Sequence, residues 1–157
     1  MGEVHTFEVE SIWTGDADGG GMLKGPDFHL DYNRPACLGG PGNQTNPEEM
    51  LVAAVVSCYS ITLAGMAEGR RLPVTRIDVA SEGDVVRGED RRLKFTAIRL
   101  RPRIVTTSTD EVQQQKILDS AYRAEDYCLV SQAMRGIVEI TVEPELVVEA
   151  EPALVAA

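Results

Sequence analysis

Residues 46–67 read Asn-Pro-Glu-Glu-Met-Leu-Val-Ala-Ala-Val-Val-Ser-Cys-Tyr-Ser-Ile-Thr-Leu-Ala-Gly-Met-Ala, and this stretch decides the fold. Asn46 suits the N-cap of a helix, Pro47 suits its first position, and the two glutamates that follow favour the positive end of the helix dipole. No residue from 50 to 67 is charged, and apolar or small residues occupy every face. The pattern predicts a helix buried on all sides, with the sulfur of Cys58 near its middle.

The same stretch reaches the lower length limit of a membrane-spanning helix, about 18 uncharged residues. However, hydroxyl side chains interrupt it at Ser57, Ser60 and Thr62, many of its members are alanine or glycine, and its flanks lack the aromatic and basic residues of membrane anchors. We therefore predict a central core helix.

Length and charge limit the class of protein. A chain of 157 residues can form one domain with a real core, and we assign residues 1–150 to a single domain and residues 151–157, rich in Glu, Pro and Ala, to a frayed tail. A net charge of −10 argues against binding to nucleic acid or to anionic membranes. The first residues lack a basic region followed by an apolar run, so we expect a cytoplasmic protein.

The three cysteines, Cys37, Cys58 and Cys128, do not form a Cys-x-x-Cys motif. In a reducing compartment they would not be a structural disulfide framework. Only His5 and His29 could help them to bind a metal, so we predict no metal site and no cofactor.

Alternating apolar residues predict strands on both sides of the central helix, at residues 3–13, 22–32, 74–86, 93–106 and around 138–142. A glycine-rich turn, residues 15–21, follows the first strand, and a loop rich in glycine and proline, residues 34–45, precedes the helix. The central helix is expected to end near Gly69, because Pro73 prevents its continuation. The element order β-β-α-β-β-α-β, with mostly antiparallel strands, predicts an α+β domain.

A second helix is predicted after Ser108-Thr109-Asp110-Glu111, which has the form of a capping box. Its buried stripe is expected at Ile117, Leu118, Ala121 and Tyr122. Cys128 follows this helix and precedes Leu129-Val130-Ser131-Gln132-Ala133-Met134, a predicted short helical turn.

Each candidate for chemistry has an alternative structural interpretation. A buried cysteine such as Cys58 is most often an inert small hydrophobe. Cys128 stands at a helix start, where the dipole favours a thiolate, but the same interpretation applies to it. Glu48 and Glu49 serve equally well as dipole compensation. Residue types alone leave these alternatives open.

A family resemblance covers nearly the whole chain. Asn46-Pro47-Glu48-Glu49-Met50-Leu51, followed by small residues and Cys58, resembles the OsmC/Ohr family of osmotically inducible and organic hydroperoxide resistance proteins. Leu38-Gly39-Gly40-Pro41-Gly42 looks like the loop that precedes this motif. Cys128-Leu129-Val130-Ser131-Gln132-Ala133-Met134 is similar to the second cysteine motif of the family, which usually has proline where Leu129 stands.

The resemblance implies a thiol peroxidase that forms an intertwined homodimer, with mostly antiparallel sheets around a buried central helix and two active sites at the subunit interface. Cys58 would be the peroxidatic cysteine, Cys128 the resolving one, and Glu48 the carboxylate that positions an arginine. One branch of the family places this arginine in the glycine turn, which here contains none. The other branch places it in the loop before the Asn-Pro-Glu motif, where Arg34 is the nearest candidate.

Helix geometry adds one inference of its own. Glu48 and Cys58 are ten residues apart in one helix, so about 15 Å separates them along its axis. They cannot touch within one chain. If Glu48 serves the site of Cys58, a partner chain brings it there.

The expected function is therefore a cytoplasmic, homodimeric peroxidase that reduces organic hydroperoxides, and hydrogen peroxide as a further substrate, with electrons from a dithiol of lipoyl type or another kind. Two alternatives stay open: a family member without peroxidase activity that binds a small molecule or acts in stress structurally, and a redox sensor whose disulfide changes a partner interaction. For Arg34 the alternative is a solvated loop residue before a proline.

Overall fold

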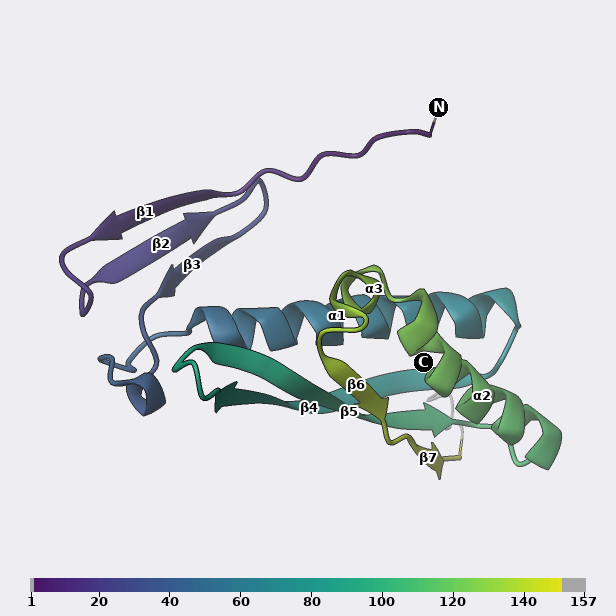
Figure 1. Cartoon of the computed structure of the whole chain (residues 1–157). Helices are drawn as coiled ribbons and strands as arrows, with labels where there is room; N and C mark the ends of the chain where they lie inside the picture. The colour runs from purple at the N-terminus through teal and green to yellow at the C-terminus, as the bar shows by residue number, and fades with distance from the viewer. Residues whose placement is uncertain (1, 151–157) are drawn as a thin grey trace. The chain divides into compact units, whose positions relative to one another are not determined.

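The computed structural model describes residues 2–150. The chain divides into two compact units, one up to Leu51 and one from Val52 on, which are described separately. The longest helix, α1 (Pro47–Gly69), begins in the first unit and continues through the second; Figure 1 shows its course. The predicted frayed tail, residues 151–157, lies outside the described residues.

The first unit contains an antiparallel sheet of three strands in chain order, β1 (Glu10–Thr14), β2 (Gly20–Lys24) and β3 (His29–Tyr32). The predicted strand over residues 22–32 is in fact two strands, because the chain turns where the Gly25 N–H donates to the Phe28 carbonyl at 3.0 Å. The short 3-10 helix η1 (Ala36–Leu38) interrupts the predicted loop before α1.

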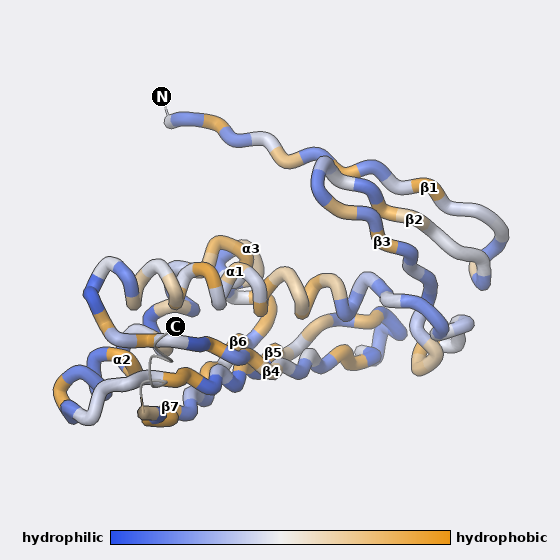
Figure 2. The backbone as a smooth tube through the Cα atoms, turned by 180° about the vertical axis from the view of Figure 1, so that it is seen from behind, coloured by the Kyte–Doolittle hydropathy of each residue, from blue (hydrophilic) through white to orange (hydrophobic). Residues whose placement is uncertain are grey.

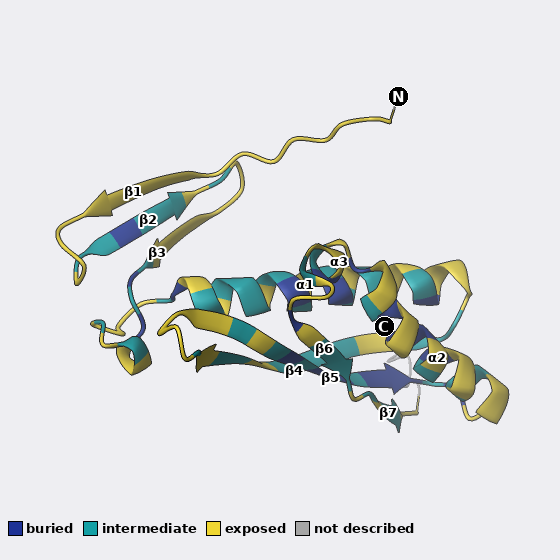
Figure 3. Cartoon of the chain, viewed as in Figure 1, coloured by how far each residue is buried: buried dark blue, intermediate teal, exposed yellow. Residues whose placement is uncertain are grey.

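The first predicted strand is also shorter than expected. Only its last residues form β1, and the described residues before it, 2–9, pair with no strand. The side chain of Phe7 is 88% exposed, and β1 is exposed along its whole length (Figure 3). The prediction of a half-buried strand was therefore wrong, because alternation identifies an apolar face without identifying what covers it.

The second unit is built on a long antiparallel hairpin, β4 (Val74–Arg87) and β5 (Leu93–Thr106), in close agreement with the predicted bounds. The predicted last strand is β6 (Glu139–Val142), and the sequence analysis missed β7 (Glu145–Val148). Both pair in parallel with β5, so this sheet is mixed.

The register explains how a proline is tolerated in the central strand β5. The partner strand β6 covers residues 97–100 of β5, and β7 covers residues 103–106. Pro102 falls between the two partner strands. Its nitrogen carries no hydrogen, and at this position no strand on that side needs one for a hydrogen bond.

α1 lies along the face of the β4–β5 hairpin with one stripe buried. Its N-cap is as predicted, since the Asn46 side chain accepts from the Glu49 N–H at 2.9 Å. The close approach of α1 to β4 depends on Gly83, because a Cβ there would lie 2.7 Å from Cγ2 of Val52. The buried stripe recurs every fourth residue: Val55, Tyr59, Leu63 and Ala67.

The opposite face of α1 is uncovered in the single chain, whereas the sequence predicted cover on every face. Ile61 on this face is 74% exposed. By length and composition α1 could also cross a membrane. Its buried stripe packs in the protein core, however, and Figure 2 shows the hydrophilic and hydrophobic residues alternating along the strands beside it. α1 is therefore a core helix of the second unit.

Two helices follow the hairpin, α2 (Glu111–Tyr127) and α3 (Leu129–Met134). The predicted capping box was wrong in its register: Asp110, not Ser108, is the N-cap of α2, and its carboxylate accepts from the Val112 N–H at 2.9 Å. Tyr122, predicted to be buried, is 56% exposed. The buried residues of α2 are instead Ile117, Ser120, Ala121 and Ala124.

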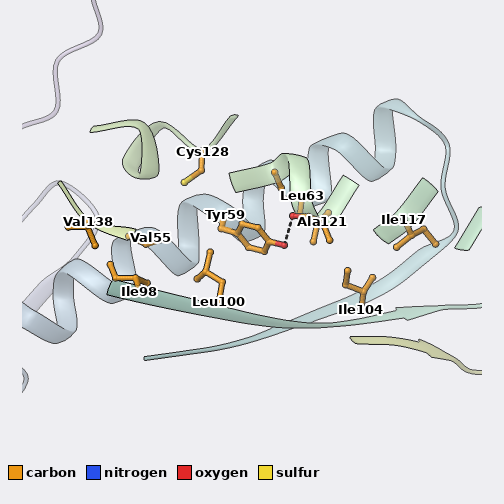
Figure 4. Packing of buried hydrophobic residues seen from close by; sticks show 11 residues of the cluster. Val55, Tyr59, Leu63, Ile98, Leu100, Ile104, Ile117, Ala121, Cys128 and Val138 are labelled. Atoms are coloured by element: carbon orange, nitrogen blue, oxygen red, sulfur yellow. Dashed lines mark hydrogen bonds between the residues drawn. The ribbon is translucent and has the colours of Figure 1, made fainter. Parts of the chain in front are cut away.

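The core of the second unit lies between α1, β5 and α2, as Figure 4 shows. At its centre is the fully buried Tyr59, whose hydroxyl donates to the Ala121 carbonyl at 2.9 Å. Burial raises the pKa of this phenol well above its ordinary value, so Tyr59 stays protonated. This hydrogen bond joins α1 to α2 and holds the segment that follows α2, which carries Cys128.

Candidate functional site

Cys58 lies in the middle of α1, next to the buried stripe and not in it. Its side chain is half-buried and packs against the core, and its sulfur is a free thiol. Because Cys58 directly precedes the anchored Tyr59, the orientation of the helix about its axis is fixed at the thiol. The central helix thus presents one reactive atom at the edge of the core.

Cys128 lies at the junction of α2 and α3 and is fully buried. Its N–H donates to the Glu125 carbonyl at 3.2 Å, and its carbonyl accepts from the Gln132 N–H at 3.0 Å. It thus caps both helices, in an extended conformation (φ −69°, ψ 115°) that separates them. Figure 4 shows its sulfur pointing toward α1.

The surroundings of Cys58 favour its thiolate. Although burial raises the pKa of Cys58, this effect is outweighed by hydrogen bonds from the thiol of Cys128 and from the backbone N–H groups of Val130 and Leu129, so the pKa lies below its ordinary value. The junction that begins with Cys128 therefore contributes both the second thiol and the first N–H groups of α3.

Cys128 has the opposite electrostatics. Burial raises the pKa of its thiol, the side chain of Ser131 opposes the rise, and the neighbouring Cys58 adds to it. The two sulfurs thus differ in their electrostatics: the pKa of the Cys58 thiol is lowered, and that of the Cys128 thiol is raised.

Sequence reasoning missed two hydroxyl groups at this site. The hydroxyl of Thr62, one turn after Cys58, has one hydrogen to donate, either to the Cys58 carbonyl at 2.8 Å or to the Cys58 sulfur, and the second bond lowers the pKa of the thiol. Ser131 stands three residues after Cys128. A threonine at i+4 from one cysteine and a serine at i+3 from the other were the signals that could have identified them.

The charged candidates lie in the first unit. Arg34 forms an ion pair with the Asp18 carboxylate and donates to the Gly39 carbonyl at 2.7 Å. Glu48 stands in the first turn of α1 and forms no ion pair among the described residues. The structure therefore brings Cys58 and Cys128 together but pairs Arg34 with Asp18 and not with Glu48.

Each of these two charged groups keeps one unsatisfied atom. Nε of Arg34 and Oε2 of Glu48 are buried and have no hydrogen-bond partner among the described residues. Buried polar atoms of native proteins are rarely left unpaired. The two side chains therefore have donor and acceptor capacity left for a partner that this single chain does not supply.

The third cysteine lies apart from this chemistry: Cys37 is exposed, in η1. Within residues 2–150 no group of three or more His, Cys, Asp or Glu side chains could hold a metal ion. The chemistry that the described residues can support is that of two thiols, one of lowered pKa, within hydrogen-bonding reach of each other.

Comparisons with known proteins place this geometry in a family. The family model for OsmC-like protein matches residues 40–143. The uncharacterized protein YmaD of Bacillus subtilis (strain 168) is 33% identical over 144 residues, which covers 88% of this chain and 93% of YmaD.

Solved structures share the fold at lower identity. An OsmC-like protein of unknown function from Vibrio cholerae O1 biovar eltor superposes with a TM-score of 0.77 at 17% identity, covering 90% of this chain and 99% of that one. An organic hydroperoxide resistance protein OsmC from Legionella pneumophila gives a TM-score of 0.72 at 20% identity, with the same coverage of both chains. The α+β fold predicted from the sequence is thus confirmed, and the chain belongs to the OsmC-like protein family.

Proposed function

We propose that this protein is a cysteine-based peroxidase that reduces organic hydroperoxides, with Cys58 as the peroxidatic residue and Cys128 as the resolving one. The Cys58 thiolate attacks the terminal oxygen of the hydroperoxide, the O–O bond breaks, and the alkoxide leaves and takes up a proton as the alcohol. Cys58 is then a sulfenic acid, which condenses with Cys128 to a disulfide and releases water. A dithiol reductant restores both thiols.

The observation that carries this proposal is the lowered pKa of Cys58 beside a second thiol. A thiolate, and not a thiol, attacks a peroxide bond. A structural buried cysteine would have a raised pKa and no reason to face another thiol across two helices. Burial raises the pKa of Cys58, and the hydrogen bonds from Cys128 and from the first N–H groups of α3 outweigh this rise, so the pKa is lowered.

Arg34 and Glu48 complete the proposed site. A guanidinium next to the thiolate would stabilise both the thiolate and the leaving alkoxide. The unsatisfied atoms, Nε of Arg34 and Oε2 of Glu48, fit a contact between these two side chains in the assembled site.

A homodimer is part of the proposal. The exposed face of α1 carries Ile61 among small residues, and a groove of about 480 Å³ beside it is lined by Ile61, Ala64, Leu72, Val74 and Ile77 together with polar side chains. Obligate dimers cover on the order of 2,000 Å² or more of such surface. Sedimentation at micromolar concentration is expected to give a dimer, and a stable monomer of 17.1 kDa would contradict it.

Turnover with cumene hydroperoxide or tert-butyl hydroperoxide and a dithiol tests the enzymatic function. Cys58→Ser is expected to abolish turnover, because no nucleophile remains. Cys37→Ser is the matched control, since Cys37 is a free but exposed thiol, and it is expected to retain full activity. Absence of turnover in the unaltered protein with both monothiol and dithiol reductants would contradict the proposal.

A second candidate function is supported by the missing cation. The groups of the second unit, residues 52–150, that lower the pKa of Cys58 include no arginine. A family member without this charge could bind a small molecule or act as a redox sensor through the same thiol pair. In that case stoichiometric peroxide would oxidise Cys58 slowly, and no catalytic turnover would follow.

A further inference from the structure

The hydroxyl of Ser131 is buried without a well-formed hydrogen bond. Ser131 has no exposed surface, and its Oγ has no partner of good geometry among the described residues. An unpaired buried hydroxyl is costly and calls for an explanation. Ser120, also fully buried, behaves differently, since its hydroxyl donates to the Lys116 carbonyl at 2.7 Å and accepts from Arg70 at 3.0 Å.

The position of Ser131 in α3 places its hydroxyl near the sulfur of Cys128. Cys128 is the N-cap residue of α3, and Ser131 is the third residue of that helix. Side chains at these two positions face each other across the first helical turn. The electrostatics agree: burial raises the pKa of Cys128, whereas the hydroxyl and the backbone N–H of Ser131 oppose the rise.

We propose that Ser131 is a further catalytic residue, which donates a hydrogen bond to the sulfur of Cys128 when that sulfur becomes a thiolate and attacks. This inference rests on the proposed peroxidase function and concerns its second step. Hydrogen bonds of catalytic groups are often poorly aligned in the resting state and tighten later. The bond is therefore incomplete with the neutral thiol and complete with the charged one.

In the resolving step, Cys128 reacts with the Cys58 sulfenic acid. Cys128 loses its proton to solvent, and its thiolate attacks the sulfur of the Cys58 sulfenic acid. The S–S bond forms as the S–O bond breaks, and hydroxide leaves and is protonated to water. The sulfur of Cys128 is oxidised and the sulfenic sulfur of Cys58 is reduced, so that both reach the oxidation state of a disulfide. No oxidant beyond the first hydroperoxide is needed.

Apart from the backbone N–H of Ser131, no other described group favours the thiolate of Cys128. From α1, Cys58 raises the pKa of Cys128, and Tyr59 is protonated and donates to Ala121. From α2, Glu125 is paired with Arg135 at 3.4 Å. No described cation is among the groups that affect the pKa of Cys128, which leaves the Ser131 hydroxyl as the side chain that favours its thiolate.

The test is a single turnover with one equivalent of cumene hydroperoxide. Dimedone-trapped Cys58 sulfenic acid and the Cys58–Cys128 disulfide are quantified by mass spectrometry over time and pH. Ser131→Ala is expected to slow disulfide formation by roughly ten- to a hundred-fold, the effect of one hydrogen bond to a charged group, and to move the pH midpoint of this step upward. The rate of Cys58 oxidation should not change.

Ser131→Thr keeps the hydroxyl and is expected to restore the rate and the pH midpoint, and Ser131→Gly gives a second comparison without a hydroxyl. Ser120→Ala, which removes a buried hydroxyl away from the thiols, should leave both steps unchanged. Normal resolution in Ser131→Ala and Ser131→Gly would overturn the inference while the peroxidase proposal stands. A failure of the unaltered protein to oxidise Cys58 would instead contradict the proposed function and this inference with it.

Discussion

The two units of the chain differ in what holds them together. Every buried hydrophobic side chain of the described core belongs to the second unit, from Val55 to Val138. The buried side chains of the first unit are instead Asn33, Pro35 and Asn46, and its three strands are joined mainly by backbone hydrogen bonds. Apolar packing thus organises one unit, and backbone pairing organises the other.

This difference separates the parts of the proposed site that a single chain arranges from the parts that it does not. Cys58 and Cys128 lie in the packed unit, so the single chain sets their environment. Arg34 and Glu48 lie in the unit without an apolar core, and each has a buried atom without a hydrogen-bond partner among the described residues. We infer that the thiol pair is prepared by folding, and that the charged pair is prepared by assembly with a second copy.

The largest expected effect is on the free energy of unfolding, and it is seen by replacing one leucine in each unit. Leu63 is fully buried, so Leu63→Ala is expected to lower the free energy of unfolding by about 2–5 kcal/mol. Leu30, on β3, is 39% exposed, and Leu30→Ala should cost less than about 1 kcal/mol. Urea unfolding measures both. Equal losses would show that the β1–β3 sheet packs in solution against another surface.

The second prediction concerns the charged half of the site. Arg34→Ala is expected to slow the reaction of Cys58 with hydroperoxide about a hundred-fold or more, the usual result of removing one preorganised donor. Arg34→Lys should recover only part of the rate, because an ammonium lacks the planar pair of donors. Stopped-flow kinetics measure the rate.

Arg101→Ala is the matched control, because Arg101 is 40% exposed, as Arg34 is, and is likewise paired with a carboxylate, that of Glu82 at 3.0 Å. It should leave the rate unchanged. If Arg34→Ala also left the rate unchanged, Arg34 would be a loop residue only, and Arg70, Arg71 and Lys24 would be the next cations to test.

The smallest expected effect lies within the packed unit. Thr62→Val removes a hydroxyl that lowers the pKa of Cys58, so the pKa should rise, and only slightly because the other donors remain. The pH midpoint of iodoacetamide alkylation, measured in a Cys37→Ser background, should therefore move upward. Thr75→Val, which removes a hydroxyl on β4, is the control and should leave the midpoint unchanged.

The sequence predicted most of the second unit and little of the first. The bounds of α1, the β4–β5 hairpin and α3 follow from strong local signals: a cap and proline, long alternation, and a short helical turn after Cys128. The bend that separates β2 from β3 and the pairing of β7 depend on contacts distant in sequence. Tyr122 appeared to belong to the buried stripe, but the helix is rotated so that Ser120 and Ala124 face the core.

At the candidate site, the sequence predicted the two cysteines as a pair but not the electrostatics around them. The lowered pKa of Cys58 depends on backbone N–H groups of Leu129 and Val130, which leave no trace in residue type. The pairing of Arg34 with Asp18 depends on how the glycine turn and the loop before α1 come together, which no local pattern encodes.

The central claim is that Cys58 and Cys128 form one redox pair. Mass mapping after one equivalent of cumene hydroperoxide tests it most directly, because a disulfide requires Cα atoms closer than about 7 Å or a small local movement. We predict a Cys58–Cys128 disulfide within one chain that a dithiol reverses. A disulfide that joins Cys58 only to Cys37, or a Cys58 that is not oxidised at all, would contradict it.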